Sequence, residues 1–90
     1  MLEIVLSNQF RKDLKLAAKR GYNLELLNDI VDKLANGEAL PEKNRDHSLT
    51  GRYTSFRECH IQPDWLLVYR VEAAALILFL SRTGTHSDLF

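Results

Sequence analysis

Several side chains of this chain have the chemistry needed to move protons on a phosphodiester. His60 is followed by the turn residues Gln62-Pro63-Asp64, Arg82 is followed four residues later by His86, and His47 lies upstream. Imidazole can act as a base or an acid near neutral pH, and a guanidinium can bind phosphate oxygens through parallel hydrogen bonds. Each group lies where an apolar stretch meets a polar turn, a place where a sheet can fix the backbone. The residue types therefore suit general acid–base catalysis on a phosphodiester.

These residues also have ordinary structural interpretations. The turn would place Asp64 beside the end of the strand that carries His60, so the two side chains could meet. Equally, Asp64 could cap its own turn while His60 donates to a backbone carbonyl. His86 lies near the C-terminus, where a lone histidine is usually just exposed. Spacing alone leaves both interpretations open for each residue.

Three neighbouring residues are expected to be partly or wholly structural. Cys59 precedes His60 on a predicted strand, so their side chains point to opposite faces, and Cys59 is expected to be a small buried hydrophobe. Trp65, the single tryptophan, is more typical of a core than of a stacking platform. Arg82 ends a very apolar run, so it either extends to the surface or points into a cleft.

A metal site is not predicted. The three histidines and Asp64 have suitable donor atoms, but their successive separations of 13, 4 and 22 residues match no local ligand pattern. The single cysteine has no partner for a paired-cysteine site. The chain also lacks a phosphate-binding glycine-rich loop and a dinucleotide-binding fingerprint. We therefore expect no metal and no cofactor.

Length and composition indicate a small globular protein. The 90 residues are expected to form one domain, residues 1–90. One cysteine cannot form an internal disulfide, which fits a reducing compartment, and the segment Met1–Leu6 lacks the basic region of a signal peptide. The longest apolar run, Ala73–Leu80, is too short to cross a membrane. We expect a cytoplasmic protein that is not embedded in a membrane.

The net charge is zero, which is unusual for a protein that binds nucleic acid. The charges are nevertheless unevenly distributed along the chain. One segment, Ser7–Arg20, carries five basic residues against Asp13 alone, and the next, Asn23–Glu42, carries Lys33 against five acidic residues. Overall neutrality therefore does not exclude a local basic surface.

The N-terminal half is expected to form a strand and two helices. Leu2–Leu6 has the alternation of a short strand, and Ser7 is a suitable N-cap for a helix that ends at Gly21. Asn23 is positioned to cap a second helix, which ends at Asn36-Gly37. The short link between the helices favours an antiparallel helical hairpin.

The pattern changes from Leu49 onward. Leu49–Tyr53 and Phe56–Ile61 are predicted strands, and Trp65–Val71 and Ala75–Leu80 are apolar enough for the middle of a covered sheet. The expected order is β-α-α-β-β-β-β. We therefore predict an α+β fold in which an N-terminal strand and a helical hairpin pack on an antiparallel-rich sheet.

Three segments carry a family resemblance. They contain the patterns H-x-L-x-G at His47, H-x-x-P-D-W at His60 and R-T-G-T-H at Arg82. Together with the N-terminal strand and the helix that begins Phe10-Arg11-Lys12-Asp13-Leu14-Lys15, they resemble the YafQ-type toxins of the RelE/ParE superfamily over nearly the whole chain. The resemblance implies a RelE-like fold.

The same resemblance implies a function and its partners. The function would be that of an mRNA interferase toxin of a type II toxin–antitoxin system, a ribosome-dependent endoribonuclease that cuts mRNA in the ribosomal A site. The partners would be a cognate antitoxin, the ribosome with its rRNA, and mRNA, with operator DNA bound only through the antitoxin complex. The implied site residues are His47, His60, Asp64, Arg82, His86 and Phe90.

Roles follow from the needs of metal-free RNA cleavage. His86 is expected to be the general acid, and Asp64, coupled to His60, the general base. The sequence leaves His60 and His47 open as alternative bases, and it does not distinguish this assignment from one with acid and base exchanged. Arg82 would hold the scissile phosphate through its planar fork, and His47 would orient the phosphate or the substrate.

Three further residues are expected to bind the substrate. Phe90 would stack on a base of the codon, and Arg45 and Arg57 would contribute positive charge near the cleft. Two alternative functions stay open: a non-catalytic toxin of the ParE branch, which acts on gyrase, and a module that only binds its antitoxin. The three imidazoles argue against the ParE alternative, because such a toxin has no need of them.

Overall fold

The computed structural model describes all residues, 1–90, and begins as the sequence predicts with a strand and two helices. These are β1 (Glu3–Leu6), α1 (Asn8–Lys19) and α2 (Leu24–Ala35). The Ser7 hydroxyl accepts from the Phe10 amide, and the Asn23 side chain accepts from the Glu25 amide. Both predicted N-caps are therefore confirmed, because each supplies an acceptor for a free amide of the first helical turn.

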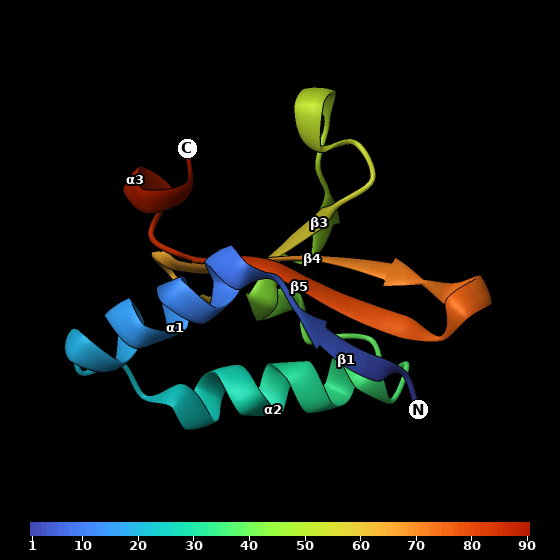
Figure 1. The fold of residues 1–90 in the computed structure, drawn as a ribbon, viewed down its shortest axis with the longest axis horizontal. Helices are drawn as coiled ribbons and strands as arrows, with labels where there is room; N and C mark the ends of the chain where they lie inside the picture. Colours follow the sequence, from blue (N-terminus) through green and yellow to red (C-terminus); the bar gives the residue numbers. More distant parts are fainter.

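The sheet has five strands in the order β1-β5-β4-β3-β2. Its later strands are β2 (His47–Ser48), β3 (Arg57–Gln62), β4 (Trp65–Glu72) and β5 (Ile77–Gly84). Only the pairing of β1 with β5 is parallel, and the other pairings are antiparallel. Figure 1 shows α1 and α2 on one side of the sheet and the short C-terminal helix α3 (His86–Leu89) on the other. The predicted α+β fold with an antiparallel-rich sheet is confirmed.

The main core lies between the helical hairpin and the sheet. Trp65 is only 2% exposed, its ring centroid lies 4.9 Å from that of Tyr22, and its indole nitrogen donates to Thr83 Oγ1 at 2.9 Å. Cys59 is fully buried in the same core. The sequence prediction that both residues are structural is therefore confirmed. The core is completed mainly by β4, β5 and the two helices, through Leu67, Tyr69, Leu78, Leu80, Phe10, Leu27, Ile30 and Leu34.

A second, smaller cluster covers the opposite face of the sheet. It is built from Leu66, Val68 and Leu89, with Leu49 and Phe56 packed against it. Leu89 belongs to α3, so burial of this one side chain holds the C-terminal helix on the sheet. The sequence did not predict α3, yet α3 carries His86 at its first position.

Two predicted strands differ from the structure. Leu49–Tyr53 is not a strand, because only His47 and Ser48 pair with β3 and the chain then turns at Gly51, which has a φ of 64°. Leu49 instead packs into the second cluster. Ala73–Ala75 forms a 3₁₀ turn, so β5 begins at Ile77 and continues to Gly84. Pairing with β4 sustains this extension, which places Arg82 inside the strand and not after it.

No helix of the chain has both the length and the apolar character needed to span a lipid bilayer.

Candidate catalytic site

The register of the sheet brings most of the predicted residues to one face. His47 pairs with Glu58, Glu58 pairs with Val68, and Val68 pairs with Arg82. Directly paired residues on neighbouring strands point to the same face of a sheet. Val68 belongs to the cluster beneath α3, so this row lies on the face opposite the helical hairpin. His60 lies on the same face, two positions along β3 from Glu58.

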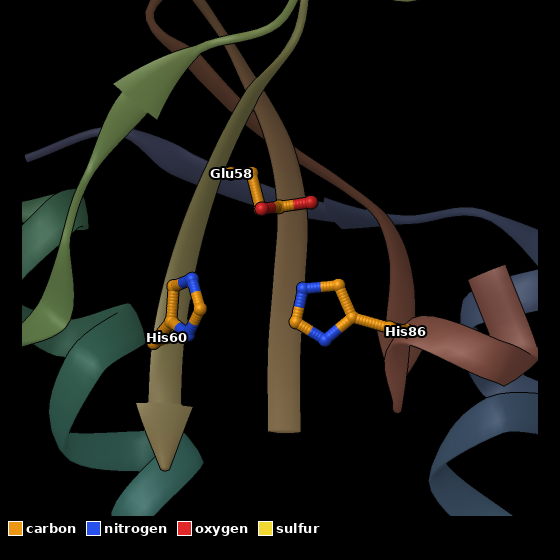
Figure 2. Close-up of side chains that lie close together, drawn as sticks. All are labelled: Glu58, His60 and His86. Carbon is orange, nitrogen blue, oxygen red and sulfur yellow. The ribbon is translucent and has the colours of Figure 1, made fainter. Parts of the chain in front are cut away.

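Three of these side chains meet in one place. The ring centroids of His60 and His86 are 5.8 Å apart. A donor atom from each of Glu58, His60 and His86 lies within 4.8 Å of the other two, and Figure 2 shows the carboxylate above the two rings. His47 adjoins this group, because its Nε2 lies 3.5 Å from a carboxylate oxygen of Glu58. The chain therefore brings residues from β2, β3 and α3 into one polar cluster.

Each histidine is anchored through its Nδ1 atom. His47 Nδ1 lies 2.6 Å from the carbonyl oxygen of Arg45, and His60 Nδ1 lies 3.2 Å from that of Pro63. His86 Nδ1 lies 2.9 Å from a carboxylate oxygen of Asp64. A carbonyl or carboxylate oxygen can only accept, so Nδ1 must carry the proton in all three rings. The nitrogen left for chemistry is therefore Nε2 in His60 and His86, whereas Nε2 of His47 faces the carboxylate of Glu58.

Asp64 pairs with His86 and not with His60. Both the ring and the backbone amide of His86 donate to the same oxygen of Asp64. These two hydrogen bonds hold the pKa of the Asp64 carboxyl below its usual range. Asp64 is therefore an ionised acceptor that orients His86, which differs from the predicted coupling to His60. The predicted turn is present at Pro63-Asp64, and His60 donates to the backbone of that turn, which is the structural alternative that the sequence left open for His60.

Glu58 is the member of the cluster that the sequence analysis missed. Its side chain is almost fully covered, with the whole residue only 6% exposed. A signal was available, since Glu58 and His60 are two residues apart on a predicted strand and must share a face. A buried acid beside several histidines, one of them with a ring nitrogen 3.5 Å from its carboxylate, is a typical functional arrangement.

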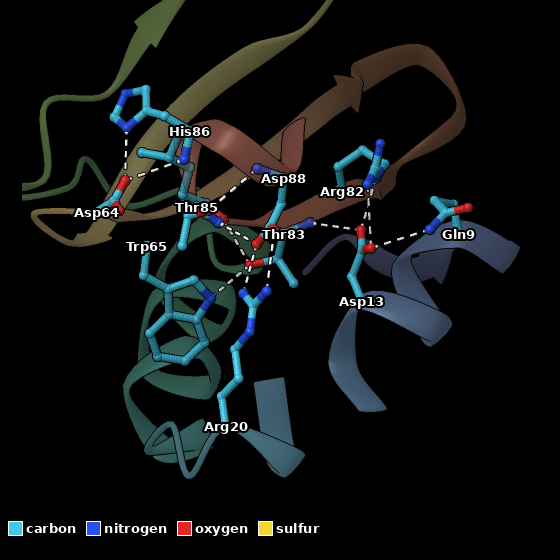
Figure 3. A network of polar contacts seen from close by, with 11 residues as sticks. Gln9, Asp13, Arg20, Asp64, Trp65, Arg82, Thr83, Thr85, His86 and Asp88 are labelled. Carbon is cyan, nitrogen blue, oxygen red and sulfur yellow. Dashed lines mark hydrogen bonds and ion pairs between the residues drawn. The ribbon is translucent and has the colours of Figure 1, made fainter. Parts of the chain in front are cut away.

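Arg82 is held by a residue from α1. Its Nε donates to Asp13 at 2.8 Å and its Nη2 at 3.3 Å, so the guanidinium faces α1, as Figure 3 shows. Asp13, only 8% exposed, also accepts from the Thr83 amide at 3.1 Å. The Asp13 hydrogen bond raises the pKa of Arg82. The structure therefore places the Arg82 backbone in the row of the cluster but turns its charged group toward Asp13.

A second ion pair fixes α3 to the helical hairpin. Arg20, at the end of α1, donates to both oxygens of Asp88 at 2.6 and 3.1 Å, and Asp88 accepts from the Thr85 amide at 2.9 Å. The Arg20 contact depresses the pKa of Asp88 and raises that of Arg20. A Cβ added at Gly84 would lie 2.9 Å from the Asp88 carboxylate, so glycine is needed for this approach. His86 is thus positioned by contacts with α1 that are distant in sequence.

The predicted substrate-binding residues lie around the cluster. Phe90 is 61% exposed, and its ring stands edge-on to that of Tyr53 with centroids 5.8 Å apart. Arg57 pairs with Asp46 at 3.2 Å and donates to Ser48 at 2.8 Å. Arg45 forms no ion pair and lines a cavity together with His60. Their roles stay predictions.

The cluster also has the donors of a cation site. Two imidazoles and one carboxylate within 4.8 Å of one another suit one divalent transition metal. Glu58, His60 and His86 would be the ligands. The sequence analysis expected no metal because it searched for local spacing, whereas these ligands come from β3 and α3.

The solved structures that resemble this chain are bacterial toxins. A metal-bound toxin from Helicobacter pylori is 48% identical, with a TM-score of 0.95 and 100% of both chains covered. A chain of the Escherichia coli DinJ–YafQ toxin–antitoxin complex is 38% identical, with a TM-score of 0.89 and coverage of 99% of this chain and 97% of that chain. The fold is therefore that of a class of small bacterial toxins.

Sequence comparison identifies the family within that class. A family profile described as "Bacterial toxin of type II toxin-antitoxin system, YafQ" matches residues 2–90. The mRNA interferase toxin YafQ of Escherichia coli K12 is 38% identical over 89 residues, which cover 98% of this chain and 95% of that protein. This chain belongs to the YafQ family of toxins of type II toxin–antitoxin systems, which confirms the resemblance seen in the sequence.

Replacing Arg20 by alanine is expected to loosen α3. The amides of Leu89 and Phe90, which bond to Thr85 and His86, should exchange with solvent faster at pH 7 than in the parent protein. Lys19→Ala is the matched control, because Lys19 is exposed and forms no ion pair. Unchanged exchange in Arg20→Ala would contradict a role for this contact in holding α3.

The same pair predicts a pH dependence. The pKa of Asp88 is depressed in the folded state, so its contribution to stability is complete above the unfolded value of about 3.9. That contribution is lost as the pH falls below the unfolded-state pKa and through the lower pKa that Asp88 has in the folded protein. Urea unfolding should therefore show a parent protein more stable than Arg20→Ala at pH 7, with the difference shrinking below about pH 4.

Proposed function

We propose that this chain is an endoribonuclease toxin that cleaves messenger RNA, is ribosome-dependent, and is held inactive by a cognate antitoxin. Membership of the YafQ family supports this, as does the E. coli relative, an mRNA interferase toxin. An antitoxin partner is supported by the DinJ–YafQ complex. The observation that carries the catalytic proposal is the convergence of His60 and His86 beside Glu58, each ring with Nε2 unengaged.

The reaction needs one base and one acid on opposite sides of a phosphate. The base takes the proton of a ribose 2′-hydroxyl as the 2′-oxygen forms a bond to phosphorus. The bond from phosphorus to the 5′-oxygen breaks, and the acid gives that oxygen a proton. The products are a cyclic 2′,3′-phosphate and a 5′-hydroxyl end. Two imidazoles with centroids 5.8 Å apart can flank one such linkage.

His86 is the acid and His60 is the base in this proposal. The ionised Asp64 that holds His86 Nδ1 stabilises the positive charge of that ring when it carries two protons, as an orienting carboxylate does in other acid–base sites. Asp64 itself is a poor base, because its pKa is lowered. The neutral His60 ring presents the lone pair of Nε2, since its Nδ1 proton is held by Pro63.

The remaining residues bind and orient the RNA. Arg82 supplies positive charge for the phosphate oxygens while Asp13 fixes two of its nitrogens, which leaves Nη1 as a free donor. His47, in contact with Glu58, orients the phosphate. Phe90 stacks on a base of the codon, and its large exposure supports this role. Arg57 is held through Nε by Asp46 and through Nη1 by Ser48, which leaves Nη2 as a donor for the RNA.

His86→Ala is expected to lower the rate of message cleavage on ribosomes by about 10²–10⁴-fold, the usual contribution of one general acid. The matched control is Ser87→Ala, an exposed neighbour on the same helix, which should cleave at the parent rate. The assay follows cleavage of ribosome-bound mRNA by purified protein. Equal rates for His86→Ala and the parent would refute the catalytic proposal and favour a toxin that acts only by binding.

We also propose that a divalent transition metal inhibits the protein through Glu58, His60 and His86. The imidazole lone pairs needed for proton transfer would be occupied, and the metal-bound H. pylori toxin supports a site in this fold. Titration calorimetry with Zn²⁺ or Cu²⁺ should show one site that His60→Ala abolishes, with cleavage lost over the same concentrations. Glu72→Gln, which alters an acid outside the cluster, should bind as the parent does. Equal binding by His60→Ala would contradict the assignment.

A further inference from the structure

A cavity of about 550 Å³ lies directly beside His60. It is bounded by the last residues of β3, by Pro63, and by the 3₁₀ turn Glu42–Asn44 with Arg45 after it. Cavities of about 300–1,000 Å³ are the size that binds small organic ligands. One nucleotide therefore fits this volume, next to a residue of the proposed catalytic pair.

The cavity wall is positively charged and contains no acidic residue. Lys43 and Arg45 both line it, and neither forms an ion pair anywhere in the chain. By contrast, the charges of Arg57 and Arg82 are balanced by Asp46 and Asp13. Two unneutralised cations beside the amide of Gln62 suit an anionic ligand with hydrogen-bonding groups.

Hydrogen bonds connect the loop that carries Lys43 and Arg45 to His60 and His47. The side chain of Asn44, only 5% exposed, donates to the carbonyl oxygen of His60 at 2.7 Å. The carbonyl of Arg45 accepts from His47 Nδ1, and the Arg45 backbone has a left-handed φ of 47°. These two hydrogen bonds fix the position of the cavity relative to the histidine cluster.

The order of the sheet sets the direction of the RNA. His86 follows β5, His60 lies on β3, and the loop with Lys43 packs beyond β3 on the side away from β5. Because His86 is the acid, the 5′-oxygen that leaves the phosphate lies next to His86. The ribose that supplies the attacking 2′-hydroxyl then lies on the side of His60. The chain upstream of the cut continues from there into the cavity.

We propose that this cavity is the subsite for the RNA segment on the 5′ side of the cut, with Lys43 and Arg45 bound to the phosphate just upstream of the attacked ribose. This subsite rests on the proposed nuclease function and on the assignment of His60 as base. It explains why the two cations that line the cavity beside His60 have no acidic partner in the protein.

The test combines a protein change with a chemical change in the RNA. The protein variant is Lys43→Gln/Arg45→Asn, because asparagine tolerates the left-handed backbone at position 45. Messages carry one neutral methylphosphonate, either at the linkage directly upstream of the attacked nucleotide or at the linkage directly downstream of the cut. Cleavage on ribosomes is compared for the parent, the double variant and the charge control Lys33→Gln, which changes an exposed lysine on α2.

The parent and Lys33→Gln should lose roughly tenfold to a hundredfold in kcat/KM with the upstream methylphosphonate, the usual worth of hydrogen bonds to a charged group. The double variant should have a lower kcat/KM than the parent on the unmodified message. The upstream methylphosphonate should not lower the kcat/KM of the double variant further. An equal loss in all three proteins, or coupling only at the downstream linkage, would overturn the subsite.

A binding measurement separates this inference from the nuclease proposal. A trinucleotide with 2′-deoxyribose at its first and second positions cannot be cleaved, and it should shift the amide signals of Asn44, Arg45 and Gln62 in NMR spectra. The same probe with an upstream methylphosphonate should not shift them. Binding without cleavage of any message overturns the nuclease and the 5′ assignment that rests on it, and leaves the cavity as an RNA-binding site only. Cleavage without these shifts keeps the nuclease and overturns the subsite.

Discussion

The site depends on one kind of contact, the hydrogen bond that each histidine donates from Nδ1. The acceptors are the Arg45 carbonyl, the Pro63 carbonyl and the Asp64 carboxylate. The three acceptors lie in two turns beside the sheet, one that ends at Arg45 and one at Pro63-Asp64, so the geometry of these two turns decides which ring nitrogen carries the proton. A ring that is fixed by one nitrogen presents the other in a defined direction. The rest of the fold serves to bring those two turns to one face.

The sequence predicted the elements well where local chemistry decides them. The caps at Ser7 and Asn23, the helical hairpin and the apolar strands follow from residue type and period. The contacts that set the site are of another kind. Arg82 with Asp13 and Arg20 with Asp88 join residues 69 and 68 positions apart, and no local pattern contains such a pair. The strand expected at Leu49–Tyr53 does not form, because the chain turns at Gly51.

Zero net charge is compatible with RNA as a partner when pairing is considered. Of the arginines, Arg20, Arg57, Arg70 and Arg82 are each paired with an acid, which reduces their contribution to the net charge near the site. The cations without acidic partners include Lys43 and Arg45 beside His60 and the lysines along α1. A phosphate that approaches the site therefore meets a local positive field from these unpaired cations, although the chain as a whole is neutral.

The most direct test of the Nδ1 anchors is the tautomeric state of the rings. Two-bond ¹H–¹⁵N NMR spectra of ¹⁵N-histidine-labelled protein, recorded well above the ordinary histidine pKa of about 6.5, distinguish the two neutral forms. His60 and His86 should both show a protonated Nδ1 and an unprotonated Nε2. A protonated Nε2 in neutral His60 or His86 would contradict the account, because the atom assigned to proton transfer would then face the wrong way.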